Sequence, residues 1–282
     1  MIKIAILGFG RLGQSLFKQV QTNARFAERF EVVGLWNRTY ERFEEAEIPR
    51  HVRTYRDIDI FMDSLEEVDL VVECAHPTIL HTYATTILSK THLFVSSPSA
   101  FGALTFYEEV RECLKTASYH CYIPLGASIG IWDVMRLEKD GLLKSVHIEM
   151  RKHPSSFKIK DPSALARLRE SAQIPGEVVV SRGNVAEINE IAPQNTNTMA
   201  IYALVAGELG FLGCKGSIIA DRSLDSHIID CYVETHLGLK TRFTRDNPAN
   251  HSAVTGKATF YSFLNSVYNY GNGMMHNGFV FC

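Results

Sequence analysis

The stretch "MIKIAILGFGRLGQSLF", residues 1–17, decides the fold of the N-terminal half of the chain. Its apolar run Ile2–Leu7 predicts a buried strand, and the amphipathic pattern over residues 11–21 predicts a helix. The segment between them, residues 8–13, has the spacing Gly-x-Gly-x-x-Gly. Because this spacing follows a strand and opens a helix, it predicts a dinucleotide-binding turn.

Each glycine of this turn has its own expected role. Gly8 permits the tight turn, Gly10 lets the backbone approach a pyrophosphate, and Gly13 lets helix and strand pack closely. The helix N-terminus adds backbone N–H groups and the positive end of the helix dipole. The predicted cofactor contacts here are Gly8, Gly10, Arg11, Leu12 and Gly13. The alternative is a tight strand–helix turn that holds no ligand.

The end of the second predicted strand, residues 31–36, bears on the choice of cofactor. NAD sites usually carry Asp or Glu there for the ribose 2′-hydroxyl, but this chain has Asn37 and Arg38. An amide does not repel a phosphate, and the guanidinium fork matches one. We therefore predict that Asn37 and Arg38 bind the cofactor and that NADP is favoured, with NAD still open. The alternative for Arg38 is a solvated loop residue.

The first 135 residues alternate between strand and helix patterns. Further strands are predicted at 69–73, 91–97 and 119–124, and helices at 79–90 and 106–117. Such alternation, with continuous apolar strands, is typical of a parallel sheet that is buried on both faces. The fold class is therefore α/β, with a Rossmann-type doubly wound parallel sheet in the N-terminal domain.

The pattern changes after about residue 140. Longer, partly alternating strands predict a second α+β domain built on a mixed sheet, with a helix near 198–209. A last helix is expected over 253–268, followed by a Gly/Asn-rich tail. We predict a Rossmann domain at 1–135, a catalytic domain at 136–252, and a C-terminal helix and tail at 253–282 that pack back on the first domain.

Composition excludes several classes of protein. The formal net charge of −2 and the absence of basic runs argue against a nucleic-acid partner. No apolar stretch approaches the ~18 residues that a spanning helix needs, and no secretory signal precedes the first strand, so we expect no membrane and a cytoplasmic location. No metal site is expected, because no Cys-x-x-Cys pair occurs among the six cysteines, which are at 74, 113, 121, 214, 231 and 282.

Several stretches carry a resemblance to a known family. The segment "VSSPSA", residues 95–100, lacks the Glu-Lys-Pro lysine of sugar and inositol dehydrogenases. Five segments in order resemble L-aspartate dehydrogenases, most closely the animal branch. They are "SPSAFGAL" (97–104), "LGASIGIWD" (125–133), "APQNTNTMAIYALVAGELG" (192–210), "IIADRSLDSHIID" (218–230) and "DNPA" (246–249). Leu125 stands where the family pattern has Ser.

The resemblance implies a function. It implies NAD(P)-dependent oxidative deamination of L-aspartate to iminoaspartate, and then to oxaloacetate and ammonia. The family's catalytic histidine falls on His227, and its cofactor contacts fall on Ala127 and Asn197. A homodimer is also implied. The chemistry agrees with this assignment, because a histidine with a pKa near ~6.5 suits proton transfer and activation of water at an iminium.

Other residues are weaker candidates for the same site. His76 and His153 each precede a proline, and either could replace His227 as the base. His76 follows a strand of the first domain, where parallel sheets meet ligands, so we expect it to line the cofactor site. Asn195 and Thr196, at a predicted helix start, are expected to bind a small dicarboxylate substrate. Arg222 is a weaker candidate for the same role.

Two alternative functions stay open. The first is a related two-domain NADP-dependent reductase, of the dihydrodipicolinate or homoserine type, with another substrate. The second is a catalytically inactive NADP-binding sensor, which the departure at Leu125 keeps open.

Overall fold

The computed structural model describes residues 1–253 and 257–282, and it divides into two compact units. The first unit comprises Met1–Ala100, Thr105–Pro124 and Phe263–Cys282. The second comprises Phe101–Leu104 and Leu125–Ser262. The first unit thus includes the C-terminal segment of the chain, which is far in sequence from the other residues of that unit. The predicted domain limits at 135 and 252 stay predictions.

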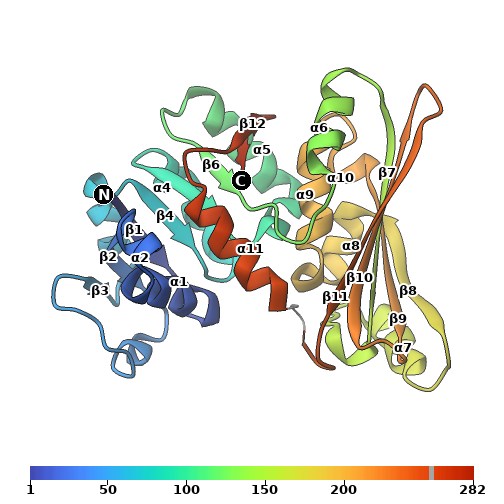
Figure 1. Ribbon diagram of the computed structural model, residues 1–282, viewed down its shortest axis with the longest axis horizontal. Coiled ribbons are helices and arrows are strands. Elements are labelled where there is room, and N and C mark those ends of the chain that lie inside the picture. Colours follow the sequence, from blue (N-terminus) through green and yellow to red (C-terminus); the bar gives the residue numbers. More distant parts are fainter. Residues whose placement is uncertain (254–256) are drawn as a thin grey trace. The chain divides into compact units, whose positions relative to one another are not determined.

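The first unit is built on an eight-stranded sheet in the order β12-β13-β6-β5-β4-β1-β2-β3 (Figure 1). All neighbouring strands pair in parallel except the edge pair β12–β13, which is antiparallel. The strands are β1 (Ile2–Leu7), β2 (Phe30–Trp36), β3 (Arg53–Tyr55), β4 (Leu70–Glu73), β5 (His92–Val95), β6 (Cys121–Ile123), β12 (Met274–His276) and β13 (Phe279–Phe281).

Helices cover both faces of this sheet. On one face the apolar side chains of α1 and α11 join those of β1 and β5 in one core cluster, which includes Leu16 and Phe263. On the other face Phe61 of α3 lies beside Gly34 of β2. The predicted doubly wound Rossmann-type unit is therefore confirmed. Its helices are α1 (Arg11–Thr22), α2 (Ala24–Ala27), α3 (Ile58–Asp63), α4 (Pro77–Leu88), α5 (Leu104–Thr116) and α11 (Lys257–Tyr268).

The second unit is built on a five-stranded mixed sheet in the order β11-β10-β7-β9-β8. Strands β7 and β9 pair in parallel, and the other neighbours are antiparallel, which confirms the predicted mixed sheet. Its strands are β7 (Leu143–Lys152), β8 (Glu177–Asn184), β9 (Lys215–Asp221), β10 (Ser226–Thr235) and β11 (Lys240–Pro248).

One face of this second sheet, which we call the inner face, is covered by helices (Figure 1). A Cβ placed on Gly216 of β9 would lie 2.9 Å from Sδ of Met199 in α9 and 3.3 Å from Cγ1 of Ile188 in α8. The helices of the unit are α6 (Ile131–Lys139), α7 (Pro162–Ser171), α8 (Val185–Ile191), α9 (Asn197–Val205) and α10 (Gly210–Gly213). Apolar side chains of α8 and α9 therefore pack against this face.

The C-terminal tail contains strands that the sequence did not predict. Strand β13 pairs in parallel with β6 and is fully buried. Strand β3 was not predicted either, because its three residues are too few to show a period. Short strands such as these are defined by the neighbouring strand and not by their own pattern. Part of the predicted last helix, residues 254–256, lies outside the described residues.

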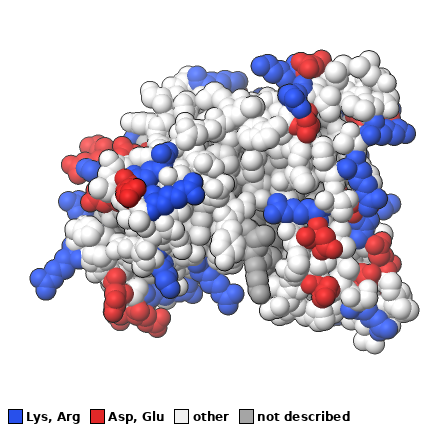
Figure 2. Space-filling model, viewed as in Figure 1, with Lys and Arg blue, Asp and Glu red and all other residues white. Residues whose placement is uncertain are grey.

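Surface charges are mixed in sign over the face seen in Figure 2. Within the described part of the chain, no helix is long and apolar enough to cross a membrane. All six cysteines are free, and those at 121, 214, 231 and 282 are buried.

Candidate active site

The glycine turn has the geometry that its sequence predicts. Gly8 has a φ of +108°, a left-handed conformation that favours glycine, and a Cβ there would meet the backbone of Cys74 and Ala75 at 2.7 Å. A Cβ on Gly13 would lie 2.1 Å from the carbonyl oxygen of Gly8. Both glycines are therefore required by close backbone packing between β1, α1 and the end of β4.

Gly10 differs from the other two, because the space beside it is open. A Cβ there would meet only Nη1 of Arg42, at 3.9 Å. Gly10 is also the N-cap of α1, no side chain caps that helix end, and no acidic residue lies in its first turn. The backbone N–H groups at this end are thus available to an anion, and the helix dipole favours one. These residues fit the pyrophosphate of a dinucleotide.

The end of β2 is tied to the glycine turn by Asn37. Its Oδ1 accepts a hydrogen bond from the Phe9 backbone N–H at 2.9 Å, and its Nδ2 donates to the carbonyl of Thr39 at 2.7 Å. The side-chain oxygen and nitrogen of Asn37 were expected to bind the cofactor. In the structure both of them stabilise the turn and its neighbouring loop instead. Arg38 is exposed. Arg42, which sequence reasoning missed, is a second exposed arginine near the turn.

His76 lies after β4 and acts as the N-cap of α4. Its Nδ1 accepts from the backbone N–H of Thr78 at 3.3 Å and lies 3.0 Å from the Thr78 hydroxyl. The contact of Gly8 with Ala75 places this segment beside the glycine turn. The first unit therefore brings together all of the predicted cofactor residues that belong to it: Gly8, Gly10, Arg11, Leu12, Gly13, Asn37, Arg38 and His76.

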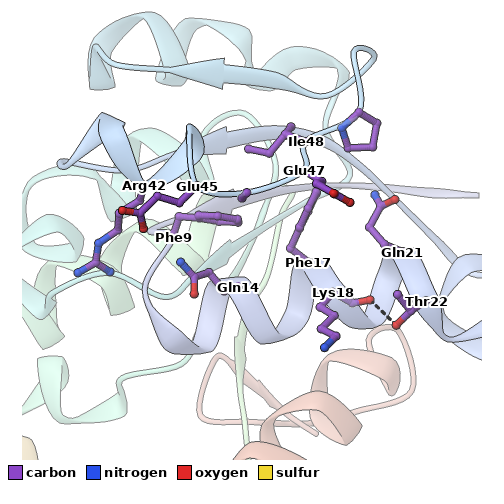
Figure 3. Close-up of a pocket in the computed structure, with 12 residues that line it drawn as sticks. Phe9, Gln14, Phe17, Lys18, Gln21, Thr22, Arg42, Glu45, Glu47 and Ile48 are labelled. Carbon is purple, nitrogen blue, oxygen red and sulfur yellow. Dashed lines mark hydrogen bonds between the residues drawn. The ribbon is translucent and has the colours of Figure 1, made fainter.

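A groove of about 800 Å³ runs along α1 (Figure 3). Phe9 and Phe17 form part of its wall, and the opposite wall is the segment of residues 42–49. The groove extends to Thr22 at the far end of α1, away from the glycine turn. At its near end the groove includes Arg42, the residue beside Gly10.

In the second unit the key residue is His227, the second residue of β10. Its side chain is 5% exposed, and its Nε2 is buried without a hydrogen-bond partner among the described residues. Burial and, as a smaller effect, the positive charge of Lys152 lower the pKa of His227 to about 4, while a hydrogen bond to the backbone of Ala253 opposes both effects. Because that bond raises the pKa, the imidazole donates it, which leaves the unpartnered Nε2 as the acceptor nitrogen at neutral pH.

Lys152 is a residue that sequence reasoning missed. It ends β7, its side chain is 3% exposed, and burial lowers its pKa to about 8. Fully buried lysines are rare. The only signal in the sequence was a lysine in the strand pattern of "LKSVHIEMRK", which is indistinguishable from a solvated strand residue until the partner strands are known.

The other predicted residues of this unit have varied surroundings. Ala127 lies half-buried in the loop after β6, and Asn197 is the first residue of α9. Asn195 is buried, and its Oδ1 accepts from the backbone N–H of Lys158 at 2.9 Å. Thr196 is also buried, and its hydroxyl donates to Oδ1 of Asn189 at 2.6 Å. The polar groups of these last two residues thus have partners inside the unit, and their substrate role stays a prediction.

The rival histidine of this unit, His153, has partners of its own. Its Nδ1 accepts from the backbone N–H of Ser155 at 3.2 Å, and its ring stacks on that of His251 with 4.1 Å between centroids. Arg222 is exposed in the turn between β9 and β10. The described residues include no group of His, Cys, Asp or Glu that could hold a metal ion. Of the two histidines, only His227 has a buried ring nitrogen without a partner.

These features define a class of protein. A parallel sheet with a dinucleotide-type turn, joined to a second unit with a buried histidine, is the plan of a two-unit NAD(P)-dependent dehydrogenase. A family described as "Homoserine dehydrogenase, NAD binding domain" matches residues 8–124, and one described as "Aspartate dehydrogenase, C-terminal" matches residues 133–266.

Individual relatives agree with the family matches. An "Aspartate dehydrogenase domain-containing protein" of Danio rerio is 33% identical over 94% of both chains. An "L-aspartate dehydrogenase" of Methanothermobacter thermautotrophicus is 25% identical over 72% of both chains. The crystal structure of an aspartate dehydrogenase from Thermotoga maritima, 24% identical, superposes with a TM-score of 0.70 over 98% of this chain and 99% of its own. The chain belongs to the aspartate dehydrogenase family, and it is an enzyme of the NAD(P)-dependent amino-acid dehydrogenase type.

Proposed function

We propose that this chain catalyses the NAD(P)-dependent oxidative deamination of L-aspartate, giving iminoaspartate and then oxaloacetate and ammonia. The observation that carries the proposal is His227, a buried histidine whose Nε2 has no partner among the described residues, in a chain of the aspartate dehydrogenase family. The name of the archaeal relative, an L-aspartate dehydrogenase, supports the choice of substrate.

His227 has the properties that the proton transfers require. Its lowered pKa keeps the imidazole neutral at neutral pH, so Nε2 can accept the proton that the substrate amine loses. NAD(P)⁺ bound at the glycine turn would accept the hydride from the substrate Cα. Once His227 has released that proton to solvent, its Nε2 can take a proton from the water that attacks the iminium carbon and return it to the amino group of the resulting carbinolamine. The carbon–nitrogen bond then breaks, the hydroxyl gives up its proton as the carbonyl of oxaloacetate forms, and ammonia leaves. A bound carboxylate would raise the pKa of His227 toward the range of an efficient base.

An absorbance assay of NADPH and NADH formation against a panel of amino acids tests this proposal. We expect L-aspartate to be oxidised, and His227→Ala to lower kcat by about 10²–10⁴-fold, the usual contribution of a general acid/base. His227→Asn should be as slow, because an amide cannot shuttle protons.

His153→Ala is the matched control, and it should keep most of the activity. Turnover that survives both His227 variants would show that another base carries the chemistry. Cofactor binding without oxidation of any amino acid would favour the sensor, and reduction of another substrate would favour the reductase.

We also propose that NADP(H) binds more tightly than NAD(H). In support, no acidic residue occupies positions 37–39 at the end of β2, and Arg38 and Arg42 are both exposed near the glycine turn. A guanidinium that binds the 2′-phosphate contributes a charge-assisted hydrogen bond, which is worth about 1.5–3 kcal/mol.

Calorimetry with the two cofactors tests this preference. Arg38→Ala should weaken NADP(H) binding by about 10- to 100-fold and leave NAD(H) binding nearly unchanged. Arg42→Ala shows whether the second arginine shares the phosphate, and Arg50→Ala, at an exposed arginine farther along the segment, is the control. Equal or tighter binding of NAD(H) by the unaltered protein would refute the preference.

A homodimer and a cytoplasmic location complete the proposed description. Both rest on the sequence, the dimer by resemblance to the family alone. Sedimentation equilibrium tests the first, and imaging of the tagged protein in cells tests the second.

A further inference from the structure

Lys152 and His227 are neighbours across two strands of the second sheet. Strands β7 and β10 are antiparallel, and their register pairs Arg151 with Ile228. The next pair in that register is Lys152 with His227. Directly opposed residues of antiparallel strands point to the same face, with Cβ atoms ~4.5–5.5 Å apart. The electrostatic effect of Lys152 on His227 agrees with this short separation.

Both side chains lie on the inner face of the sheet and are almost completely buried. Lys152 lies on the same side of β7 as the buried Met150, and Arg151, between them, faces the other side. His227 precedes the buried Ile229 and Cys231 on that side. An ammonium group in such a place loses most of its hydration, so its charge is strongly felt by any anion that enters. Nε2 of His227, which has no hydrogen-bond partner among the described residues, is an acceptor on the same face as the ammonium group of Lys152.

The surrounding charges favour an anion. On the third strand, β11, Asn247 pairs with His227, and Arg245 pairs with Ile229, so both point to the inner face. Nε of Arg245 donates to Oδ1 of Asn247 at 3.0 Å. Arg245 therefore adds a second cation near His227.

The acidic residues of the same strands face away from this point. Asp230 and Glu149 lie on the outer face, where both pair with Arg151. Asp230 also accepts from Arg242 and Thr244. Their negative charge is thus neutralised within the outer network and does not offset Lys152 on the inner face.

We propose that Lys152 binds a carboxylate of the substrate beside His227, so that the ligand of this site is a small carboxylic acid whose carboxylate is attached to the reacting carbon. This inference rests on the proposed function, since it assigns a substrate-binding residue to the site of His227. In this arrangement the ammonium group of Lys152 binds the carboxylate, and the imidazole of His227 beside it reaches the amine on the same carbon. Binding of the carboxylate also neutralises the charge that lowers the pKa of His227, which makes the imidazole a better base once substrate is present.

Binding of malonate, an unreactive dicarboxylate, tests the site without turnover. Isothermal titration calorimetry is performed on the full chain with NADP⁺ present, and malonamide serves as the uncharged counterpart. We expect malonate to bind and malonamide not to bind. Lys152→Met, which preserves length and removes the charge, should weaken malonate binding by about 10- to 100-fold. Lys160→Met, at an exposed lysine of the same unit, should leave it unchanged.

A second variant covers the case in which Lys152→Met does not fold, as judged by circular dichroism. Asn247→Asp leaves Lys152 in place and introduces a negative charge across from His227, so it too should weaken malonate binding at least tenfold. The inference is overturned if the unaltered protein does not bind malonate, if it binds malonamide equally well, or if a folded Lys152→Met or Asn247→Asp variant binds malonate like the unaltered protein. Malonate binding that depends on Lys152, in a protein that does not oxidise L-aspartate, would retain this inference and reject the proposed function.

Discussion

At the scale of single residues, buried ionisable groups are the features of this chain with the largest consequences. Glu73, at the end of β4, is 0% exposed, and its Oε2 accepts from the backbone N–H of Ser96 at 3.2 Å. Burial raises the pKa of Glu73 to about 8, although hydrogen bonds from neighbouring backbone groups oppose the shift. Glu73 is therefore protonated in the folded state at neutral pH, whereas it is ionised in the unfolded chain.

This difference predicts a pH dependence of stability. Between the unfolded pKa of 4.5 and the folded pKa of about 8, the folded state binds the extra proton, so the free energy of unfolding should fall as the pH rises. Glu73→Gln removes the titration. We expect this variant to be more stable than the unaltered protein at pH above about 8, by on the order of a few kcal/mol, and to lose that advantage near pH 5.

Urea unfolding across this pH range provides the measurement. Glu67→Gln, at an exposed glutamate, is the control and should follow the unaltered protein. Parallel pH profiles for the unaltered protein and Glu73→Gln would mean that Glu73 is ionised in the folded state.

At the scale of elements, the C-terminal strand shows how a neighbour can impose structure on a weak pattern. Strand β13 has only three residues, yet it extends the first sheet by pairing with β6, and Phe279 and Phe281 are fully buried. The glycine before it, Gly278, has a φ of +85°, which the tight turn from β12 requires. The Gly/Asn-rich composition of the tail thus belongs to its turns.

This placement predicts that the tail stabilises the first unit. Phe281→Ala should lower the free energy of unfolding by about 3–5 kcal/mol, because it removes a large buried side chain and leaves a cavity. Met274→Ala, at a residue of edge strand β12 that is 50% exposed, should change it by less than about 0.5 kcal/mol. Chemical denaturation of both variants compares them directly, and similar stabilities would show that the tail is not part of the folded core.

At the scale of the whole molecule, the chain divides its proposed tasks between two units. The first contains the glycine turn and the residues that fit a dinucleotide, and the second contains His227 and Lys152. The first unit includes the C-terminal segment after residue 262, so both ends of the sequence belong to the same unit. The last helix, α11, belongs to the second unit up to Ser262, and from Phe263 onward it belongs to the first, to whose core it contributes Phe263 and Val267.

The sequence by itself determined the features that depend on local spacing. The strand Ile2–Leu7, the glycine turn and the helix after it follow from residues that are adjacent in the chain, where periodicity and backbone sterics act directly. The alternation of strands and helices likewise predicted the parallel sheet. His227 was also found, through the resemblance of its segment to a known family, although its role stays a proposal.

Only the tertiary structure decided which side chains meet across strands. Lys152 lies 75 positions before His227 in the sequence, and only the register of β7 with β10 makes them neighbours. The pairing of β13 with β6 is also decided by the tertiary structure. So are the hydrogen bonds that Asn195 and Thr196 make inside the second unit. The physical reason is that burial and charge coupling depend on distance in space, and a short sequence window contains no information about the partner strand.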